Sequence, residues 1–180
     1  MELETRRLIL RPFTEEDAAG LYEYARDPRV GPAAGWPPHK SLEESREIIR
    51  TVFSAPDTFA VADKSTGRVI GSAGFVDRHQ MLLPGPDDEI GYALHPAFWG
   101  RGLMPEAAAE LLRYGFEDRG LAAIWCGHYD FNDQSRRVVE KCGFLYRFTG
   151  RTWAELMGEE RTELHYALTR EEWLAQRGRN

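Results

Sequence analysis

Cysteine is scarce in this sequence: Cys126 and Cys142 are the only two among 180 residues. Their spacing is not that of a metal site, and two thiols do not suggest a disulfide framework. Long apolar runs are also absent, because no stretch approaches the roughly 18 consecutive apolar residues that a membrane span requires. These absences argue against a disulfide-rich secreted scaffold, a cysteine-based metal domain and a membrane-spanning protein.

A targeting segment is missing as well. Residues 1–4, Met-Glu-Leu-Glu, are not the basic start and apolar core of a signal peptide, so a cytoplasmic location is expected. No linker, internal repeat or low-complexity tract interrupts the chain. With 42% hydrophobic and 12% aromatic residues the composition is that of a globular chain, and residues 1–180 are expected to form a single domain.

Positive charge is in deficit, since 23 lysines and arginines stand against 29 aspartates and glutamates, a formal net charge of −6. This balance argues against a nucleic-acid groove as the main surface. It favours a cationic substrate through weak electrostatic steering. The histidines show no metal-ligand spacing, so no metal is expected.

Residues 89–106 are the most informative segment of the chain. Apolar side chains alternate with polar or small ones over residues 89–94, as in a half-buried strand. Gly100 and Gly102 then allow backbone geometry that a side chain would obstruct, and Pro105 suits the first turn of a helix. The pattern predicts a strand, a stripped turn and a helix N-terminus, whose free N–H groups and dipole favour a phosphate or pyrophosphate.

Several nucleotide-binding interpretations compete for this turn. A P-loop needs Gly-x-x-x-x-Gly-Lys-Ser/Thr, which the chain does not contain. A dinucleotide fingerprint needs a third glycine where this sequence has Pro105, which weakens a nicotinamide-dependent enzyme. A tight strand–helix turn without any ligand is the remaining structural alternative.

The turn resembles the pyrophosphate loop of the acetyl-CoA-dependent N-acetyltransferases of the GNAT superfamily. The pattern Arg/Gln-x-x-Gly-x-Gly/Ala falls on residues 97–102, with Ala97 in place of the Arg or Gln. Main-chain amides hold most of the pyrophosphate in that family, so the replacement is expected to weaken binding rather than abolish it. The resemblance implies that acetyl-CoA, as co-substrate, is bound by Leu94, Trp99, Gly100, Arg101, Gly102, Leu103 and Met104.

A second segment, residues 132–144, resembles another GNAT motif. It carries Asn132, then Ser135 in a short helix, then Glu-Lys-Cys-Gly-Phe. The similarity is to the Rim-type branch, the ribosomal-protein N-terminal acetyltransferases. It implies that Asn132 hydrogen-bonds the pantetheine arm and that Ser135 approaches the coenzyme sulfur. Arg101, Arg136 and Arg137 are candidates to meet the coenzyme's phosphates, with a solvated surface position as the alternative for Arg137.

The resemblance extends over the whole chain, since residues 5–17 look like the first strand and helix cap of the family and residues 166–173 like its closing strand and terminal helix. The implied fold is mixed α/β: a central, mostly antiparallel sheet of about six to seven strands with one splayed strand pair, flanked by about four to five helices. In that fold the acetyl-pantetheine arm fills the splay as an extra strand.

Local patterns predict the elements in the same order. Capping boxes at Thr14, Ser41 and Thr169 predict helix starts, and Asn132 or Asp133 caps a short later helix. The first two helices are expected to end near residues 24 and 53, and the segment 27–39 is expected to be irregular. Strands are expected over residues 59–62, 69–75, 89–94, 121–129, 145–148 and 163–168.

The resemblance also suggests catalytic roles. Glu89, on the strand before the turn, is the candidate general base, because an ammonium group with a pKa of about 8 to 10 must lose a proton before it attacks. The alternative is that Glu89 faces solvent beside Asp87 and Asp88. A strand bulge near Leu94 is expected to free an N–H that polarises the thioester carbonyl.

The leaving thiolate needs a proton donor, for which Ser135 is the candidate. Tyr129 and Tyr146 are alternatives that are equally read as core or rim aromatics. Cys142 is not expected to act as a nucleophile, because it lies near a helix end and thiolates are favoured at helix starts.

The predicted function is transfer of an acetyl group from acetyl-CoA to a primary amine by direct attack in a ternary complex. The acceptor is expected to be a protein N-terminus or a small polyamine-like or aminoglycoside-like molecule. Its site is expected to be walled by the two N-terminal helices, the 76–88 loop and the last hairpin, with Trp36, Trp153 and residues 31–39 as candidates to line it. A catalytically weak acyl-CoA-binding module of the same fold is the alternative. No nucleic acid or membrane partner is expected, and a homodimer is compatible with the sequence.

Overall fold

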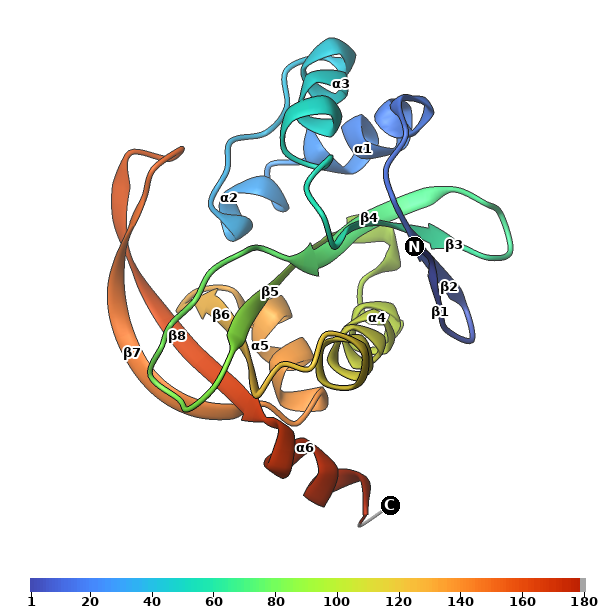
Figure 1. Cartoon of the computed structure of the whole chain (residues 1–180). Helices are drawn as coiled ribbons and strands as arrows, with labels where there is room; N and C mark the ends of the chain where they lie inside the picture. Colours follow the sequence, from blue (N-terminus) through green and yellow to red (C-terminus); the bar gives the residue numbers. More distant parts are fainter. Residues whose placement is uncertain (179–180) are drawn as a thin grey trace.

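The computed structural model describes residues 1–178, and one sheet of eight strands runs through the molecule (Figure 1). Its order is β1-β2-β3-β4-β5-β6-β8-β7. The predicted mixed α/β fold is confirmed, with slightly more strands than expected. The strands are β1 (Leu3–Glu4), β2 (Leu8–Arg11), β3 (Thr58–Asp63), β4 (Val69–Phe75), β5 (Asp87–Leu94), β6 (Ala123–Tyr129), β7 (Leu145–Ala154) and β8 (Glu159–Thr169).

Helices cover both faces of the sheet: α1, α2 and α3 lie on one face and α4 and α5 on the other, with α6 following β8 (Figure 1). The Ser41 side chain accepts the backbone N–H of Glu44, and Thr169 forms the predicted capping box with Glu172. The helices are α1 (Ala18–Ala25), α2 (Gly31–Ala34), α3 (Leu42–Thr51), α4 (Leu103–Arg113), α5 (Asp133–Lys141) and α6 (Arg170–Arg177), with short turns η1 (Glu15–Asp17), η2 (Pro96–Phe98) and η3 (Tyr114–Asp118).

The segment 27–39 corrects one expectation, since it contains the one-turn helix α2 rather than irregular chain only. Proline occupies the start of this turn, and Gly35 ends it with a φ of 95°. A proline at the start and a left-handed glycine at the end are the ordinary boundaries of a helix. The many prolines and glycines of this segment hid a helix that is only four residues long.

The last hairpin is also longer than predicted, with ten residues in β7 and eleven in β8. Its outer part carries charged residues on both strands, and Arg151 pairs with Glu160 at 2.9 Å. No apolar alternation marks this region as strand. The backbone ladder and cross-strand pairs extend it instead.

The central strands β5 and β6 run parallel, whereas the other neighbouring pairs are antiparallel. They pair only from Asp87 opposite Ala123 to Glu89 opposite Trp125. Beyond this short contact the two strands separate, which is the predicted splay.

The bulge expected near Leu94 is absent, and that prediction is wrong. The register between β4 and β5 is continuous from Phe75 opposite Ile90 to Gly71 opposite Leu94. The sheet's register shifts lie in β3 and β7 instead.

Two apolar clusters hold the layers together. The larger lies between the sheet and α4, α5 and α6 and contains Leu111, Phe116 and Ile124, each at 0% exposure. The smaller lies under α1 and α3 around Leu21 and Tyr24. Over residues 1–178, none of the helices has the length and apolar composition needed to cross a membrane.

Candidate active site

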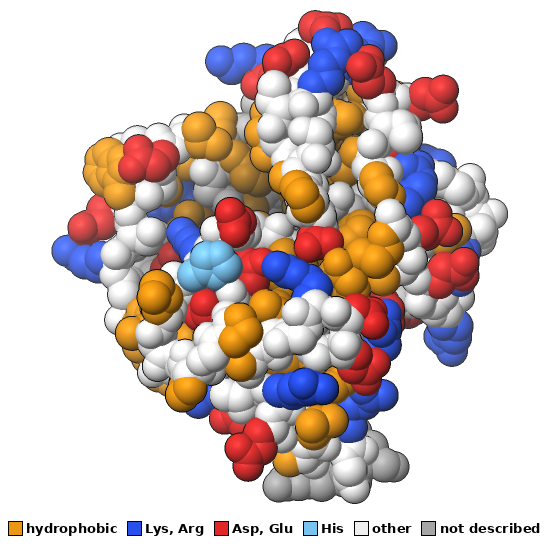
Figure 2. All heavy atoms as spheres, viewed as in Figure 1, with side chains coloured by type: hydrophobic (Ala, Val, Ile, Leu, Met, Phe, Trp, Pro, Cys, Tyr) orange, Lys and Arg blue, Asp and Glu red, His pale blue; other side chains and the backbone are white. Residues whose placement is uncertain are grey.

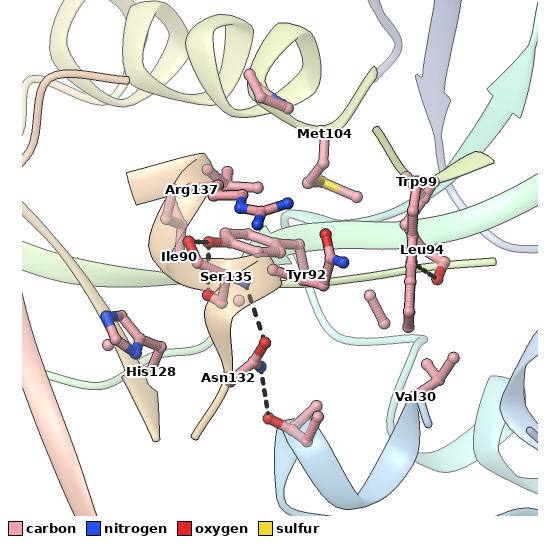
Figure 3. A pocket seen from close by; sticks show the side chains of 18 of the residues that line it. Val30, Ile90, Tyr92, Leu94, Trp99, Met104, His128, Asn132, Ser135 and Arg137 are labelled. Atoms are coloured by element: carbon pink, nitrogen blue, oxygen red, sulfur yellow. Dashed lines mark hydrogen bonds between the residues drawn. The ribbon is translucent and has the colours of Figure 1, made fainter. Parts of the chain in front are cut away.

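A cavity of about 620 Å³ opens where β5 and β6 splay apart. Its walls come from β5, β6, α2, the turn before α4, and α5. Figure 3 shows Tyr92 and Ser135 pointing toward each other in it, with Trp99 and Met104 beside the turn before α4. The segments singled out in the sequence thus meet in one place.

The turn between β5 and α4 is stripped of side chains at two points. Gly100 and Gly102 have φ values of 73° and 74°, in the left-handed region that favours glycine. Gly102 is the N-cap of α4, so the first backbone N–H groups of that helix have no partner within it. Trp99 steadies the turn by donating its indole N–H to the carbonyl of Leu94 at 2.8 Å. The turn presents unpaired amides and a helix dipole to the cavity, an arrangement that suits an anion.

The start of α5 is tied to its surroundings by Asn132. Its Oδ1 accepts the backbone N–H of Ser135 at 3.0 Å, and its Nδ2 donates to the carbonyl of Ala33 at 2.9 Å (Figure 3). Asn132 is therefore the cap of α5, and one of its two amide hydrogens remains for another acceptor.

Ser135 is 8% exposed, and its Oγ lies 2.8 Å from the hydroxyl oxygen of Tyr92. Burial raises the pKa of Tyr92 well above its usual value, which keeps the phenol protonated and able to donate. Tyr92 was not predicted as a functional residue. Its place in the alternating strand indicated only that it is half-buried.

The closed end of the splay is acidic. Glu89 is 6% exposed; its carboxylate accepts from Arg78 Nη1 at 3.2 Å and from Gln80 Nε2 at 3.3 Å. Burial raises the pKa of Glu89, the nearby Arg78 lowers it, and the carboxylate of Glu163 raises it. The net direction is upward, which suits a base at neutral pH.

The alternative that residues 87–89 form a solvent-facing acidic run is wrong. Asp87 and Asp88 are 4% and 1% exposed. Asp87 accepts the backbone N–H groups of Gln80 and Met81 at 3.1 and 3.0 Å, and Asp88 accepts that of Arg78 at 3.2 Å. The two aspartates anchor the loop that carries Arg78.

Glu163, on β8, also lines the cavity and was not predicted. Its Oε1 lies 3.4 Å from Arg78 Nη1. Figure 2 shows a hollow between the β7–β8 hairpin and the helices of the α1–α3 layer, with acidic and basic side chains together at its rim. A strand period of two, with a glutamate on the same face as Ala167, could have indicated that Glu163 points inward.

The model of a known protein family matches most of this chain. The family model described as "Acetyltransferase (GNAT) domain" matches residues 7–145. This chain belongs to the GNAT acetyltransferase family. It is therefore an acyltransferase of that family, which uses acetyl-CoA.

Relatives of this GNAT protein match it over different shares of their length. The uncharacterized N-acetyltransferase YoaA of Bacillus subtilis is 29% identical over 147 residues, 79% of this chain and 81% of the relative. The FsC-acetyl coenzyme A-N(2)-transacetylase of Aspergillus fumigatus is 39% identical over 88 residues, 48% of this chain and 37% of its own length. A GNAT-family acetyltransferase structure from Bacillus anthracis has a TM-score of 0.84 at 26% identity, covering 96% of this chain and all of the other.

Most residues suggested by the resemblance line the cavity of this GNAT protein. They are Glu89, Leu94, Trp99, Gly100, Gly102, Leu103, Met104, Asn132 and Ser135. Arg101 and Arg136 do not line it. The guanidinium of Arg101 lies over the ring of Phe98, 5.2 Å from its centroid, and Arg136 pairs with Asp133 at 3.0 Å.

Two cations of α5 do line the cavity: Arg137, which is one of the candidates for a phosphate contact, and Lys141, which was not predicted. They are four residues apart and share a helix face with Gln134 and Val138, which also line it. The helical period of α5 could have predicted this face.

The alternative candidates differ in their relation to the cavity of this GNAT protein. Tyr129 lines it, but Tyr146 is 55% exposed and bonds to Thr149. Trp36 and Trp153 are not among its walls. Burial raises the pKa of Cys142 to about 12, so its thiol stays protonated.

Proposed function

We propose that this protein transfers the acetyl group of acetyl-CoA to a primary amine in a ternary complex. The observation that carries the proposal is that a helix N-terminus suited to pyrophosphate and a buried carboxylate suited to a base lie at the two ends of one cavity. Family membership supplies the class of reaction, and these residues supply its parts.

The residues of the turn fit the coenzyme. The amides from Gly100 to Met104 would hold the pyrophosphate, and Arg137 and Lys141, which line the same cavity, would supply positive charge for the phosphates. When it is bound, acetyl-CoA supplies the acetyl group as a reactive thioester. The protein's part is to hold and orient it.

The edge of β5 facing the splay would bind the pantetheine arm. Val76 donates its N–H to Glu89 O, and His95 donates to Ile70 O, so the odd-numbered residues of β5 direct their backbone groups toward β4. Backbone direction alternates along a strand. The N–H groups of Tyr92 and Leu94 therefore face the gap, where the arm's amides can pair with them, whereas Ile90 directs its N–H toward β6 where the two strands are still paired.

The resemblance suggested that the Glu89 carboxylate and the Leu94 amide act on the same acetyl group, but their positions on β5 are too far apart for this. Leu94 lies five residues from Glu89, which is about 17 Å along an extended strand. One acetyl group cannot reach both. We assign the Leu94 amide to the pantetheine arm and the Tyr92 amide, which is two residues closer to Glu89, to the thioester carbonyl.

In the proposed reaction, three side chains of the cavity move protons: Glu89, Ser135 and Tyr92. Glu89 accepts a proton from the acceptor ammonium, directly or through a water, and the amine nitrogen forms a bond to the acetyl carbon as the carbon–sulfur bond breaks. Ser135 donates a proton to the departing thiolate and recovers one from Tyr92, with which it is hydrogen-bonded. The excess proton on the attacking nitrogen leaves to solvent as the amide forms, water returns a proton to Tyr92, and Glu89 releases its proton to solvent before the next turnover. The Tyr92 N–H stabilises the negative charge on the carbonyl oxygen.

The acceptor is proposed as an exposed amine, of a small molecule or of a protein. The acidic net charge of −6 and the buried carboxylate favour a cation. Among relatives, one is named an N(2)-transacetylase and another, 29% identical over 100 residues, a putative ribosomal N-acetyltransferase from Bacillus subtilis. The alternative of a binding module without turnover is not favoured, because Glu89 and Ser135 both line the cavity.

The test is calorimetric titration of the purified protein with acetyl-CoA, CoA and NAD, followed by mass spectrometry of an amine panel with acetyl-CoA. Micromolar binding of both CoA species, no binding of NAD, and a mass gain of one acetyl group on an amine are expected. Binding without transfer to any amine would contradict the transferase proposal. Binding of NAD but of neither CoA species would contradict the assignment of acetyl-CoA as the coenzyme.

A further inference from the structure

Two buried carboxylates from different strands converge on one guanidinium. Arg78 Nη1 lies 3.2 Å from Glu89 Oε1 and 3.4 Å from Glu163 Oε1. Glu89 and Glu163 are 6% and 7% exposed, and both line the cavity. They belong to β5 and β8, which are separated in the sheet by β6.

The side chain of Glu163 reaches the cavity because of a glycine in β6. A Cβ added at Gly127 would lie 2.5 Å from Glu163 Oε1, too close for two such atoms. The missing side chain at Gly127 thus leaves the space in which the Glu163 carboxylate lies over β6 and approaches Glu89. The glycine in β6 therefore allows the carboxylates of β5 and β8 to approach each other across this strand.

The charges of this cluster do not balance. Two carboxylates share one guanidinium, and no other arginine or lysine within residues 1–178 is within ion-pair distance of either. His165 lies 3.7 Å from Glu163, but burial lowers the pKa of His165 and favours its neutral form. When both acids are ionised, one negative charge remains for an incoming cation.

We propose that Glu89 and Glu163 form a two-carboxylate subsite for the ammonium group of the acceptor, in which Glu163 binds the acceptor and Glu89 takes its proton. The proposal rests on the proposed amine acetyltransferase function and names the part of the site that selects its substrate. It requires the reacting group to arrive as a single positive charge. Hydroxyl and thiol acceptors, which lack that charge, would gain nothing from Glu163.

Arg78 has a defined place in this arrangement. It comes from the loop between β4 and β5, donates to both carboxylates, and is about half exposed. Its positive charge favours the ionised form of the pair, whereas each carboxylate disfavours ionisation of the other. Besides Arg78, the titratable groups nearest to the pair are His165, His128, Tyr129 and Cys126.

The first experiment compares Glu163→Gln with Glu160→Gln, a matched control on the same strand whose carboxylate is half-exposed and pairs with Arg151. With the best amine from the panel, Glu163→Gln should raise the KM for the amine about tenfold, the loss expected for a hydrogen-bonded ionic contact. The kcat should stay within threefold and the Kd for acetyl-CoA should not change. The control should behave as the wild type.

The pH profile supplies a readout that a purely structural role would not move. Loss of the Glu163 charge should lower the pKa of Glu89, so the acid limb of kcat/KM should shift to lower pH. Arg78→Gln should shift it to higher pH, because a positive neighbour is lost. Glu163→Asp, which keeps the charge but shortens its reach, should give an intermediate KM and serves if the glutamine variant folds poorly.

The outcomes separate the two proposals. Wild-type KM and an unmoved acid limb in Glu163→Gln, with the wild type active on amines, would overturn the subsite and leave the transferase function intact. Equal loss of activity toward an amine and a hydroxyl acceptor would also overturn it. Failure of the wild type to acetylate any amine while it binds CoA would overturn both.

Discussion

The hydroxyl of Tyr92 lies 2.8 Å from Oγ of Ser135, so the middle of β5 and the first turn of α5 are joined across the cavity by one hydrogen bond. The same phenol lies 3.7 Å from the thiol of Cys126. Burial keeps the phenol protonated. Tyr92 can therefore donate to Ser135 while Ser135 donates elsewhere, which is the arrangement that the proposed proton relay requires.

If the relay operates, Tyr92→Phe and Ser135→Ala should each lower kcat by about tenfold, and the double variant should be little worse than either single one, because groups that act as a unit are not additive. Single-turnover kinetics of all four proteins would give the coupling. Tyr22→Phe is the control, since Tyr22 lies on the exposed side of α1 and outside the cavity. Fully additive losses would mean that the two residues act separately.

Glu89→Gln should reduce kcat/KM by about a hundredfold or more, the range for loss of a general base. Burial raises the pKa of Glu89, so the wild-type acid limb should lie above the usual range for a glutamate, and activity should fall as the pH falls through it. Calorimetry should show unchanged affinity for acetyl-CoA. An unchanged rate in this variant would remove Glu89 from the chemistry.

The cations of α5 provide a test of where the phosphates bind. Arg137→Ala and Lys141→Ala should each weaken CoA binding several-fold, and the loss should shrink at high salt because the interaction is electrostatic. Arg101→Ala and Arg136→Ala should have little effect, since neither side chain lines the cavity. Titrations of the four variants at low and high salt would measure this difference. The reverse ranking would restore the residues that the family resemblance indicated.

Ala97→Arg would return the pyrophosphate loop to the pattern of the family. Ala97 is exposed, so the new side chain has room and should lower the Kd for CoA by a few-fold, as an exposed ion pair does. Ala97→Gln would separate hydrogen bonding from charge. A weaker Kd in both variants would mean that the loop has adapted to the small residue.

Gly102→Ala should weaken both the fold and the coenzyme site. An L-residue at a φ of 74° costs about 1–2 kcal/mol, and the strained residue is the cap of α4. The melting temperature should fall by about 2–8 °C, and CoA affinity should fall with it. Gly67→Ala is the control, because Gly67 has a φ of 70° in a hairpin turn with open space around it and outside the cavity. It should lose a similar stability and keep its affinity.

Some parts of the site could be predicted because they depend only on neighbouring residues. The glycines of the turn before α4 and the Asn132 cap of α5 are local devices, and their residue types are visible in the sequence. The separation of the two central strands was expected from the family resemblance, not from any local sequence pattern. Its position, just after Glu89, appears only in the pairing of β5 with β6.

Other parts depend on which strands become neighbours. Arg78, Glu89 and Glu163 meet because a loop, β5 and β8 converge, and no local pattern relates positions 74 residues apart, as Glu89 and Glu163 are (163 minus 89). Tyr92 likewise looked like an ordinary half-buried strand residue. The burial of Asp87 and Asp88 was unexpected because consecutive acids usually face solvent.

The three consecutive acids of β5 have two different tasks: Asp87 and Asp88 hold the preceding loop, and Glu89 lines the cavity. Asp87 and Asp88 fix the loop backbone at Arg78, Gln80 and Met81, and this anchoring holds the Arg78 guanidinium against Glu89. Beyond Met81 the loop runs out into solvent, with Leu82 63% exposed. Residues 82–86 do not line the cavity, so substitutions there should leave the Arg78 guanidinium and the two carboxylates in place. The two buried aspartates thus insulate the charged cluster from changes at the exposed tip of the loop.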